Sequence, residues 1–575
     1  MKNKIIFLLI GIIFFSCNSL DLNPLSEASS ENWYTNKEGI EMAINHLYNN
    51  GFWNTNDYDD KLSNITQDKA EWTDSWTDDW TCRTNLSVIA GGTINSQADI
   101  VNRQWNIAYV CIANANIILS KLEDLSSEIN EETLKKYCAL ARFARAYQYS
   151  KLIFFFGDVP FYTKELTIEE SLNLSRTTKK SVLDSIYSDY NYAASILPVS
   201  YGSSDLKYMT KGAVLGFKAR IALYMGDWTV ARDAAKACMD LGVYQLLPSF
   251  WDVTSKKNSI ETIFAVPRSA ALGYCMSTRR TSQAMTRNAG HTDYVQPSWQ
   301  LLCSFLCTDG LPIDESPLYN PHNPFRNRDP RCTATIVEFG TRHLGYKYEP
   351  HPDSLTTLNY LTGAYVKNKE SKGSDQYATF NGLMWKKGIT EGGWSNSLLV
   401  DVDDIVLRYA DVLLMYAEAK IELGEINQSV LDAMNQVRTR AYNNTGIQYP
   451  VITVTDQSKL RKIVRLERRM EFAFEARRYY DIIRWKQAEK VLNQPIYGLL
   501  DVAALRNNVV KPGLWFFPGI PPIDEDGVAD FSAMYNAGLI KLLAIQKFDS
   551  SKQYLWPIPS TEIKVNSNMT QNPGY

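Results

Sequence analysis

Residues 52–80 combine aromatic rings with carboxylates at unusual density. Four of the chain's 14 tryptophans lie in this segment, together with many aspartates. Rings such as those of Trp72, Trp76 and Trp80 stack on the C–H faces of sugars. Carboxylates such as that of Asp68 accept hydrogen bonds from sugar hydroxyls. The composition of this segment therefore predicts a saccharide-binding site.

The spacing of the same three tryptophans supports a second interpretation, a buried helical stripe. Residues four apart lie on one face of an α-helix, which a protein core often covers. The Thr, Ser and Asp residues between the tryptophans prefer caps and turns, so they would make a poor helix. A ligand platform and a hydrophobic core therefore both stay open from the sequence.

No catalytic signature is found elsewhere in the chain. None of the five histidines lies in an H-E-x-x-H motif, and the G-x-S-x-G, G-x-G-x-x-G and P-loop motifs are missing. We therefore expect neither an enzyme nor a cofactor. Two alternatives stay open: a glycosidase pair of carboxylates distant in sequence, and a structural calcium ion at the acidic clusters 401–404 or 524–527. The formal net charge of -3 gives no electrostatic basis for binding a nucleic acid.

The first 16 residues have the pattern of a secretory signal peptide. Lys2 and Lys4 precede the apolar run 5–15, which is followed by a small residue and then Cys17. This order is typical of bacterial lipoproteins, so we expect Cys17 to become the lipidated first residue of the mature chain. No later stretch reaches the roughly 18 apolar residues of a membrane span. The chain is therefore expected to be anchored to a membrane by lipid and not to cross it.

The elements that must position these residues are predicted to be mostly helical. Apolar periodicity and good helix formers predict helices over residues 98–122, 131–156, 211–225, 228–241, 409–442 and 459–490. Gly226 and Gly424 separate helix pairs whose small residues are similar to those of tetratricopeptide hairpins. Residues 245–393 and 500–553 are rich in Pro, Gly, Asn and aromatics, which predicts loops with short strands. Long loops of this kind are usually functional.

Three motifs resemble the SusD/RagB family of surface glycan-binding lipoproteins of Bacteroidetes. They are Leu20-Asp21-Leu22-Asn23-Pro24 after the lipid cysteine, the Glu- and Arg-dense segment 467–485, and the terminal run from Leu555-Trp556-Pro557 to Gln571-Asn572-Pro573-Gly574-Tyr575. Ala476 stands where the family usually has glycine, and we interpret it as a small change on a helix. Because the motifs bracket the mature chain, one composite domain is predicted. Its parts are a helical part (17–245), a loop-rich insertion (246–400) and a C-terminal SusD/RagB part (401–575), after the signal peptide (1–16).

The resemblance implies a mainly α-helical fold, an α-α superhelix of tetratricopeptide-like hairpins with a long loop-rich ligand-binding section. It implies a non-enzymatic lipoprotein on the surface of the outer membrane. Such a protein captures an oligosaccharide or polysaccharide and passes it to a SusC-like TonB-dependent transporter. The Glu- and Arg-dense segment is then structural, with ion pairs that fix helix packing. The alternatives are a RagB-like lid with a peptide cargo, a surface glycoside hydrolase, and a scaffold subunit that does not touch the substrate.

The family places its glycan site on loops from the early region and from the middle of the chain. The resemblance therefore adds residues from the middle of the chain to the candidates of the tryptophan-rich segment. The predicted glycan-binding residues are Trp72, Trp76, Trp80, Asp68, Arg83, Tyr294, Trp299 and Trp394.

Overall fold

Long helices make up the first part of the chain and return after residue 408. The computed structural model describes residues 34, 36–48, 50–53, 73–83, 86–202, 208–276, 282–394 and 399–575. The long helices and the helix that follows them are α5 (Asp99–Asp124), α6 (Glu131–Phe156), α8 (Lys179–Ile196), α9 (Lys211–Met225), α10 (Trp228–Met239), α15 (Tyr409–Glu422), α16 (Gln428–Tyr442), α17 (Gln457–Glu471) and α18 (Arg478–Arg484).

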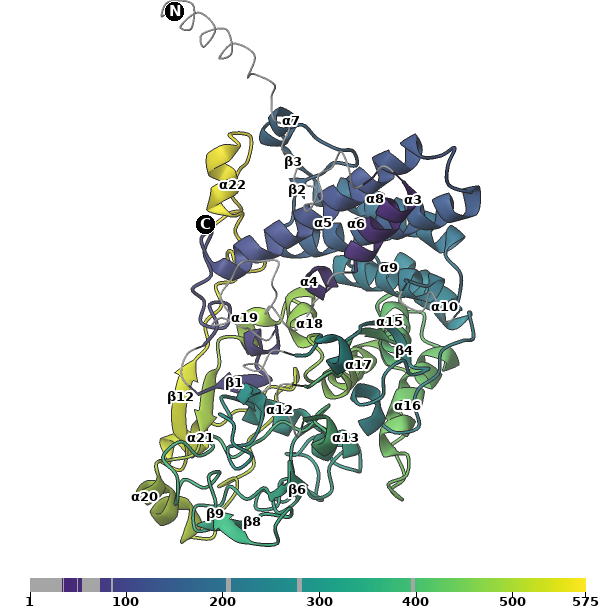
Figure 1. The fold of residues 1–575 in the computed structure, drawn as a ribbon. Helices are drawn as coiled ribbons and strands as arrows, with labels where there is room; N and C mark the ends of the chain where they lie inside the picture. Colours follow the sequence, from purple (N-terminus) through teal and green to yellow (C-terminus); the bar gives the residue numbers. More distant parts are fainter. Residues whose placement is uncertain are drawn as a thin grey trace, which may run out of the picture.

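These helices pack on one another as successive hairpins. Helix α5 packs on α6, α6 on α8, α8 on α9 and α9 on α10. Helix α10 then contacts α15, which packs on α16 and α17, although the loop-rich section separates α10 from α15 in the sequence. One hydrophobic core runs through the scaffold, where the buried ring of Trp53 stacks on Tyr147 with centroids 4.5 Å apart. The predicted helical-hairpin scaffold is thus confirmed (Figure 1).

Local sequence signals set the ends of the scaffold helices. The Thr210 hydroxyl accepts a hydrogen bond from Ala213 N–H (3.2 Å) at the start of α9. Gly226 ends this helix with a left-handed φ of 77°, a conformation that glycine adopts without steric cost. Asp227 then accepts from Val230 N–H (3.4 Å) and caps α10. The Gly226-Asp227 turn between two helices therefore lies where the sequence predicts it.

The segment predicted as one helix over 459–490 is divided in the structure. Helix α17 ends at Glu471, and α18 begins only at Arg478. Between them Phe474 and Ala476 have left-handed φ values of 61° and 56°. This conformation costs a residue with a Cβ atom roughly 1–2 kcal/mol, which explains why glycine suits position 476. The expectation that Ala476 lies on a helix is therefore wrong, because it lies in a turn.

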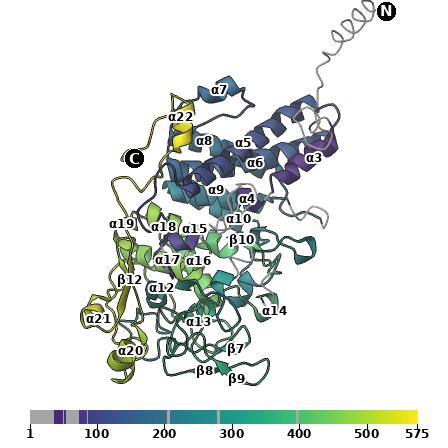
Figure 2. The ribbon, with the colours of Figure 1, turned by 60° about the vertical axis from the view of Figure 1, so that its left-hand side comes forward.

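Short elements fill the rest of the described chain, and the loop-rich section packs below the scaffold in both views (Figures 1 and 2). The antiparallel strand pairs are β1 (Trp80–Cys82) with β5 (Val295–Pro297), β2 (Val159–Pro160) with β3 (Arg176–Thr177), β4 (Thr262–Val266) with β10 (Asp404–Arg408), β6 (Arg342–His343) with β7 (Tyr346–Lys347), β8 (Thr356–Leu358) with β9 (Tyr365–Lys367), and β11 (Pro495–Gly498) with β12 (Lys541–Ile545). The short helices include α3 (Lys37–His46), α4 (Asn50–Trp53), η3 (Thr73–Trp76), α7 (Ile168–Leu172), α12 (Trp299–Ser304), α13 (Pro330–Thr335), α14 (Glu391–Trp394), α19 (Ala488–Val491), α20 (Val502–Leu505), α21 (Ser532–Asn536) and α22 (Ser560–Val565).

Candidate functional site

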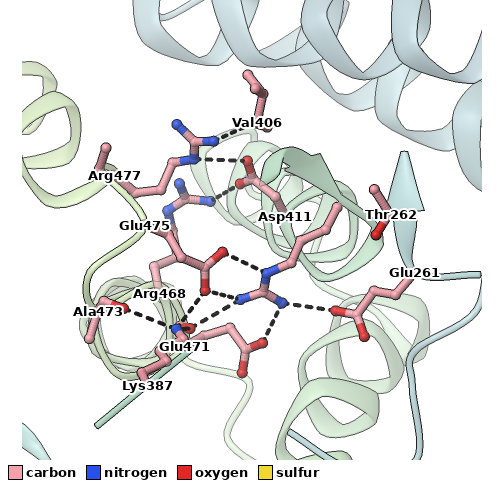
Figure 3. Close-up of polar contacts among 12 residues, drawn as sticks. Glu261, Thr262, Lys387, Val406, Asp411, Arg468, Glu471, Ala473, Glu475 and Arg477 are labelled. Carbon is pink, nitrogen blue, oxygen red and sulfur yellow. Dashed lines mark hydrogen bonds and ion pairs between the residues drawn. The ribbon is translucent and has the colours of Figure 1, made fainter. Parts of the chain in front are cut away.

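The Glu- and Arg-dense segment forms a buried network of ion pairs (Figure 3). Arg408, the last residue of β10, contacts Glu261 (Nη1–Oε1 2.9 Å), Glu471 (Nη1–Oε1 2.6 Å) and Glu475 (Nε–Oε2 2.7 Å). Lys387 Nζ lies 2.5 Å from Glu475 Oε1. All five side chains are almost fully buried. The segment therefore supplies interior ion pairs, as predicted, and these side chains are not available to a ligand.

The cations of this network keep its carboxylates ionised. Burial alone would raise the pKa of Glu471, but Arg440, Arg408 and Arg331 hold that pKa at about 2. The pKa of Asp411 also lies below its usual range, despite burial, because guanidinium groups surround it. Removing a charge from water costs several kcal/mol, which only close opposite charges compensate. Each buried carboxylate of the network is therefore stable as an ion only while the cations beside it are present.

Three tryptophans of the predicted site have side chains that the structure describes, and all three lie in the protein core. Trp76, in η3, is 0% exposed and packs against Tyr479 with centroids 5.3 Å apart. Trp80, in β1, is 2% exposed and packs against Phe474 (4.3 Å). Trp299, the first residue of α12, is 3% exposed. Because buried rings offer no face to a sugar, the prediction that these three tryptophans bind a glycan is wrong.

The nearby carboxylates are also used inside the protein. Asp78 Oδ2 lies 2.7 Å from Arg469 Nη2, and Asp78 Oδ1 lies 2.9 Å from Arg478 Nε. Asp79 Oδ1 lies 2.6 Å from Arg469 Nη2. These aspartates therefore tie the tryptophan-rich segment to α17 and α18, and they do not face a ligand.

Several predicted positions fall outside the described residues. These are Cys17, Asp68 and Trp72, together with the side chain of Trp394, the last residue of α14. Their roles in lipid attachment and glycan binding stay predictions.

The structure brings together two predicted site residues, Arg83 and Tyr294. They continue the β1–β5 ladder, and Arg83 N–H donates to Tyr294 O (2.9 Å). The Arg83 guanidinium donates to the carbonyl oxygens of Asp293 (3.3 Å) and Ala378 (3.2 Å) and lies over the ring of Phe380 (5.3 Å). Its side chain is still 20% exposed. Arg83 is therefore held by the protein and remains accessible to solvent.

Residues that were not among the predicted site residues complete this surface. Arg287, also 20% exposed, lies over the ring of Tyr377 (5.4 Å) and 3.5 Å from Asp375 Oδ1. Tyr377 is 54% exposed, and its N–H donates to Asp375 Oδ1 (2.9 Å). The only sequence signal for these residues was the aromatic and Gly content of the loop-rich section. We call the following set the Arg83 cluster: Arg83, Arg287, Asp293, Glu370, Asp375 and Tyr377.

The exposed part of the Arg83 cluster has the chemistry of a sugar-binding surface. The Tyr377 ring offers a face for stacking. The guanidinium groups of Arg83 and Arg287 donate hydrogen bonds, and the carboxylate of Asp375 accepts them. This combination suits the hydroxyls and C–H faces of a saccharide.

Two buried carboxylates, those of Asp293 and Glu370, lie behind the exposed groups. Gln296 Nε2 donates to Asp293 Oδ2 (2.5 Å), and Asn288 N–H donates to Glu370 Oε1 (3.0 Å). Burial, together with the like charge of Glu370, raises the pKa of Asp293 well above its usual value. Burial raises the pKa of Glu370 to about 7, against the opposing effect of backbone N–H groups and nearby arginines.

The pKa of the Glu370 carboxyl is 4.5 in its ordinary state and about 7 in the folded protein. The free energy of unfolding should therefore fall as the pH rises from 4.5 to about 7, and we expect the substitution Glu370→Gln to make this fall smaller. A raised folded-state pKa stabilises the protein fully below the unfolded pKa, and this stabilisation is lost as pH rises through the folded value. Glutamine keeps an oxygen acceptor for Asn288 N–H and does not titrate. Denaturant unfolding at several pH values measures the effect, with the exposed Glu128→Gln as control. If the free energy of unfolding of Glu370→Gln changed with pH as steeply as that of the wild type, the expectation would be contradicted.

The acidic clusters proposed as calcium sites are paired with cations. Lys257 Nζ lies 3.1 Å from Asp401 Oδ2, and Arg268 Nη2 lies 2.5 Å from Asp404 Oδ2. In the second cluster, Asp524 Oδ2 lies 2.9 Å from a lysine ammonium. Within the described residues, no three His, Cys, Asp or Glu side chains are grouped to hold a metal ion. The structure therefore gives no support to the calcium alternative.

Comparison with known protein families gives matches to both the N-terminal and the C-terminal parts of the chain. The model of the SusD family matches residues 261–575. The chain belongs to the SusD family. A second model of this group, described as starch-binding and associating with the outer membrane, matches residues 20–223. A SusD-like protein of Formosa agariphila is 23% identical to the chain over 100% of both sequences.

Solved structures of SusD-like proteins share the fold. A SusD-like carbohydrate-binding protein of Bacteroides fragilis is 25% identical, with a TM-score of 0.75 over 94% of this chain and 100% of that one. A laminarin-binding SusD-like protein is 18% identical, with a TM-score of 0.62 over 94% and 100%. These findings confirm the resemblance to the SusD/RagB family and the mainly α-helical fold. None of the helices in the described part of this SusD-family chain is long and apolar enough to cross a bilayer.

Proposed function

We propose that this SusD-family protein is a non-catalytic surface lipoprotein that captures an oligosaccharide or polysaccharide at the Arg83 cluster. One observation carries the proposal: an exposed Tyr377 ring lies beside guanidinium donors and a carboxylate acceptor on the loop-rich section. The description of the family model as starch-binding supports a carbohydrate ligand. Aromatic stacking with hydrogen bonds gives modest affinity, which suits a protein that must release its cargo.

The proposal includes delivery of the glycan to a partner. Removal of residues 1–16 and lipidation of Cys17 attach the protein to the outer surface of the outer membrane. A SusC-like TonB-dependent transporter then receives the glycan, and residues 17–575 act as one composite unit over it. The association with the outer membrane in the description of the family model supports this part. Mass spectrometry of the affinity-purified wild type from detergent-solubilised membranes should identify the transporter, and Cys17→Ala should abolish membrane attachment.

A polysaccharide panel tests the capture function. In native affinity gels that contain neutral and acidic polysaccharides, we expect at least one polysaccharide to retard the purified mature protein. Incubation with the same polysaccharides is expected to release no new reducing ends. New reducing ends would identify a glycoside hydrolase and contradict the proposal. Retardation by no polysaccharide, combined with binding to a peptide mixture, would identify a peptide cargo and also contradict it.

A further inference from the structure

A cavity lies in the loop-rich section, apart from the Arg83 cluster. Its volume is about 290 Å³, close to the lower end of the range for small-molecule pockets, roughly 300–1,000 Å³. Residues from the segments 322–325 and 338–354 line it, together with Trp515. None of these lining residues belongs to the Arg83 cluster. The cavity is therefore a separate feature that the proposed capture function does not use.

Aromatic rings form one wall of this cavity. The half-buried Trp515 ring lies 5.1 Å from the His351 ring at an interplanar angle of 72°, and 6.4 Å from the Phe339 ring at 33°. Phe516, which is 1% exposed, packs against Trp515 from the core (5.1 Å). A ring held on several sides loses little freedom when a ligand stacks on it. The wall therefore offers a rigid, partly exposed stacking face.

Hydrogen-bonding groups line the rest of the cavity. The carboxylates of Glu338 and Glu349 and the amide of Asn323 are among them. Glu349 Oε1 accepts from His351 N–H (3.3 Å), which helps to fix this carboxylate. His351 Nδ1 accepts from Asp353 N–H (3.2 Å), so the neutral ring carries its proton on Nε2 as a donor. No Lys or Arg occurs among the described lining residues.

We propose that this cavity binds one uncharged sugar unit as a second carbohydrate site. Trp515 stacks on the C–H face of the sugar, and the carboxylates of Glu338 and Glu349 accept hydrogen bonds from its hydroxyls. A uronate or sulfated sugar would bring a like charge toward both carboxylates, and none of the described lining residues is a Lys or Arg that could pair with it. A metal site does not explain the cavity, because no three potential metal ligands are grouped within the described residues. The inference rests on the proposed function and narrows its ligand to glycans that contain neutral units.

Fluorine NMR of protein labelled with 5-fluorotryptophan tests the inference at a single residue. The variant Trp515→Phe identifies the Trp515 signal among those of the 14 tryptophans. Methyl glycosides of neutral hexoses, deoxyhexoses and pentoses are titrated, followed by glucuronate and galacturonate. We expect at least one neutral glycoside to shift the Trp515 signal, and we expect the uronates to leave it in place.

Three further variants test whether the Trp515 shift comes from binding in this cavity and not from binding elsewhere in the protein. Glu338→Gln is expected to weaken binding of the neutral glycoside roughly tenfold, because the variant loses a charge-assisted hydrogen bond. Its matched control, the exposed Glu315→Gln, and the cluster variant Arg83→Met are expected to leave the Trp515 shift as in the wild type. The other tryptophan signals report whether each variant is folded.

The outcomes distinguish failure of this inference from failure of the proposed function. If no neutral glycoside moves the Trp515 signal while a polysaccharide still retards the protein in gels, the second site is overturned and the capture function stands. If neither occurs, both are overturned. An equal shift with uronates overturns the assignment to a neutral sugar. An unchanged affinity in Glu338→Gln overturns the role of the Glu338 carboxylate as a hydrogen-bond acceptor for the sugar.

Discussion

Replacing Glu471 by alanine is expected to lower the free energy of unfolding by about 3–5 kcal/mol, because it removes one partner from a buried ion-pair network. Glu471 lies 2.6 Å from Arg408 and 3.2 Å from Arg331, and it also pairs with Arg440. All four side chains are almost fully buried. The alanine variant therefore leaves three guanidinium groups in the interior without their shared acceptor.

Denaturant unfolding followed by tryptophan fluorescence measures this effect. Asp184→Ala is the matched control, because Asp184 forms an exposed ion pair with Lys180 (3.0 Å) on α8. Exposed pairs of this kind contribute at most about 1 kcal/mol. If Glu471→Ala destabilised the protein no more than Asp184→Ala, the structural role of the network would be contradicted.

The helical scaffold was predictable because its signals are local. Apolar periodicity and the caps at Thr210, Gly226 and Asp227 lie within a turn of the helix ends that they set. The turn between α17 and α18 has no such signal, because Phe474 and Ala476 disfavour the left-handed conformation that they adopt. A tertiary contact supports this turn: the Ala476 N–H donates to Asp74 Oδ2 (3.2 Å), 402 positions away.

The candidate site was less predictable because its parts come from distant segments. The density of Trp and Asp over 52–80 suggested a sugar platform, yet Trp76 is buried and Asp78 pairs with Arg469, 391 positions away. Whether such groups face solvent depends on partners that no local pattern shows. Arg83 was predicted, whereas Tyr377 becomes recognisable only when folding places it beside a second arginine.

Replacing Tyr377 by alanine is expected to weaken glycan binding roughly tenfold, which corresponds to ~1.4 kcal/mol. The ring is 54% exposed, and the Arg287 guanidinium lies 5.4 Å from its centroid. The variant removes the stacking face of the Arg83 cluster and leaves the polar groups of Arg83 and Asp375 in place. Because this ring is exposed, the free energy of unfolding should change by no more than about 0.5 kcal/mol.

Glycan capture by the Arg83 cluster is tested most directly by calorimetric titration with the polysaccharide that retards the protein most strongly. The wild type, Tyr377→Ala and the control Tyr535→Ala are compared. Tyr535 is also exposed (42%), but it lies on α21 and packs on Tyr497 (5.4 Å), outside the cluster. We predict a roughly tenfold larger Kd for Tyr377→Ala and an unchanged Kd for Tyr535→Ala. A Kd for Tyr377→Ala equal to that of the wild type would contradict glycan binding at the Arg83 cluster.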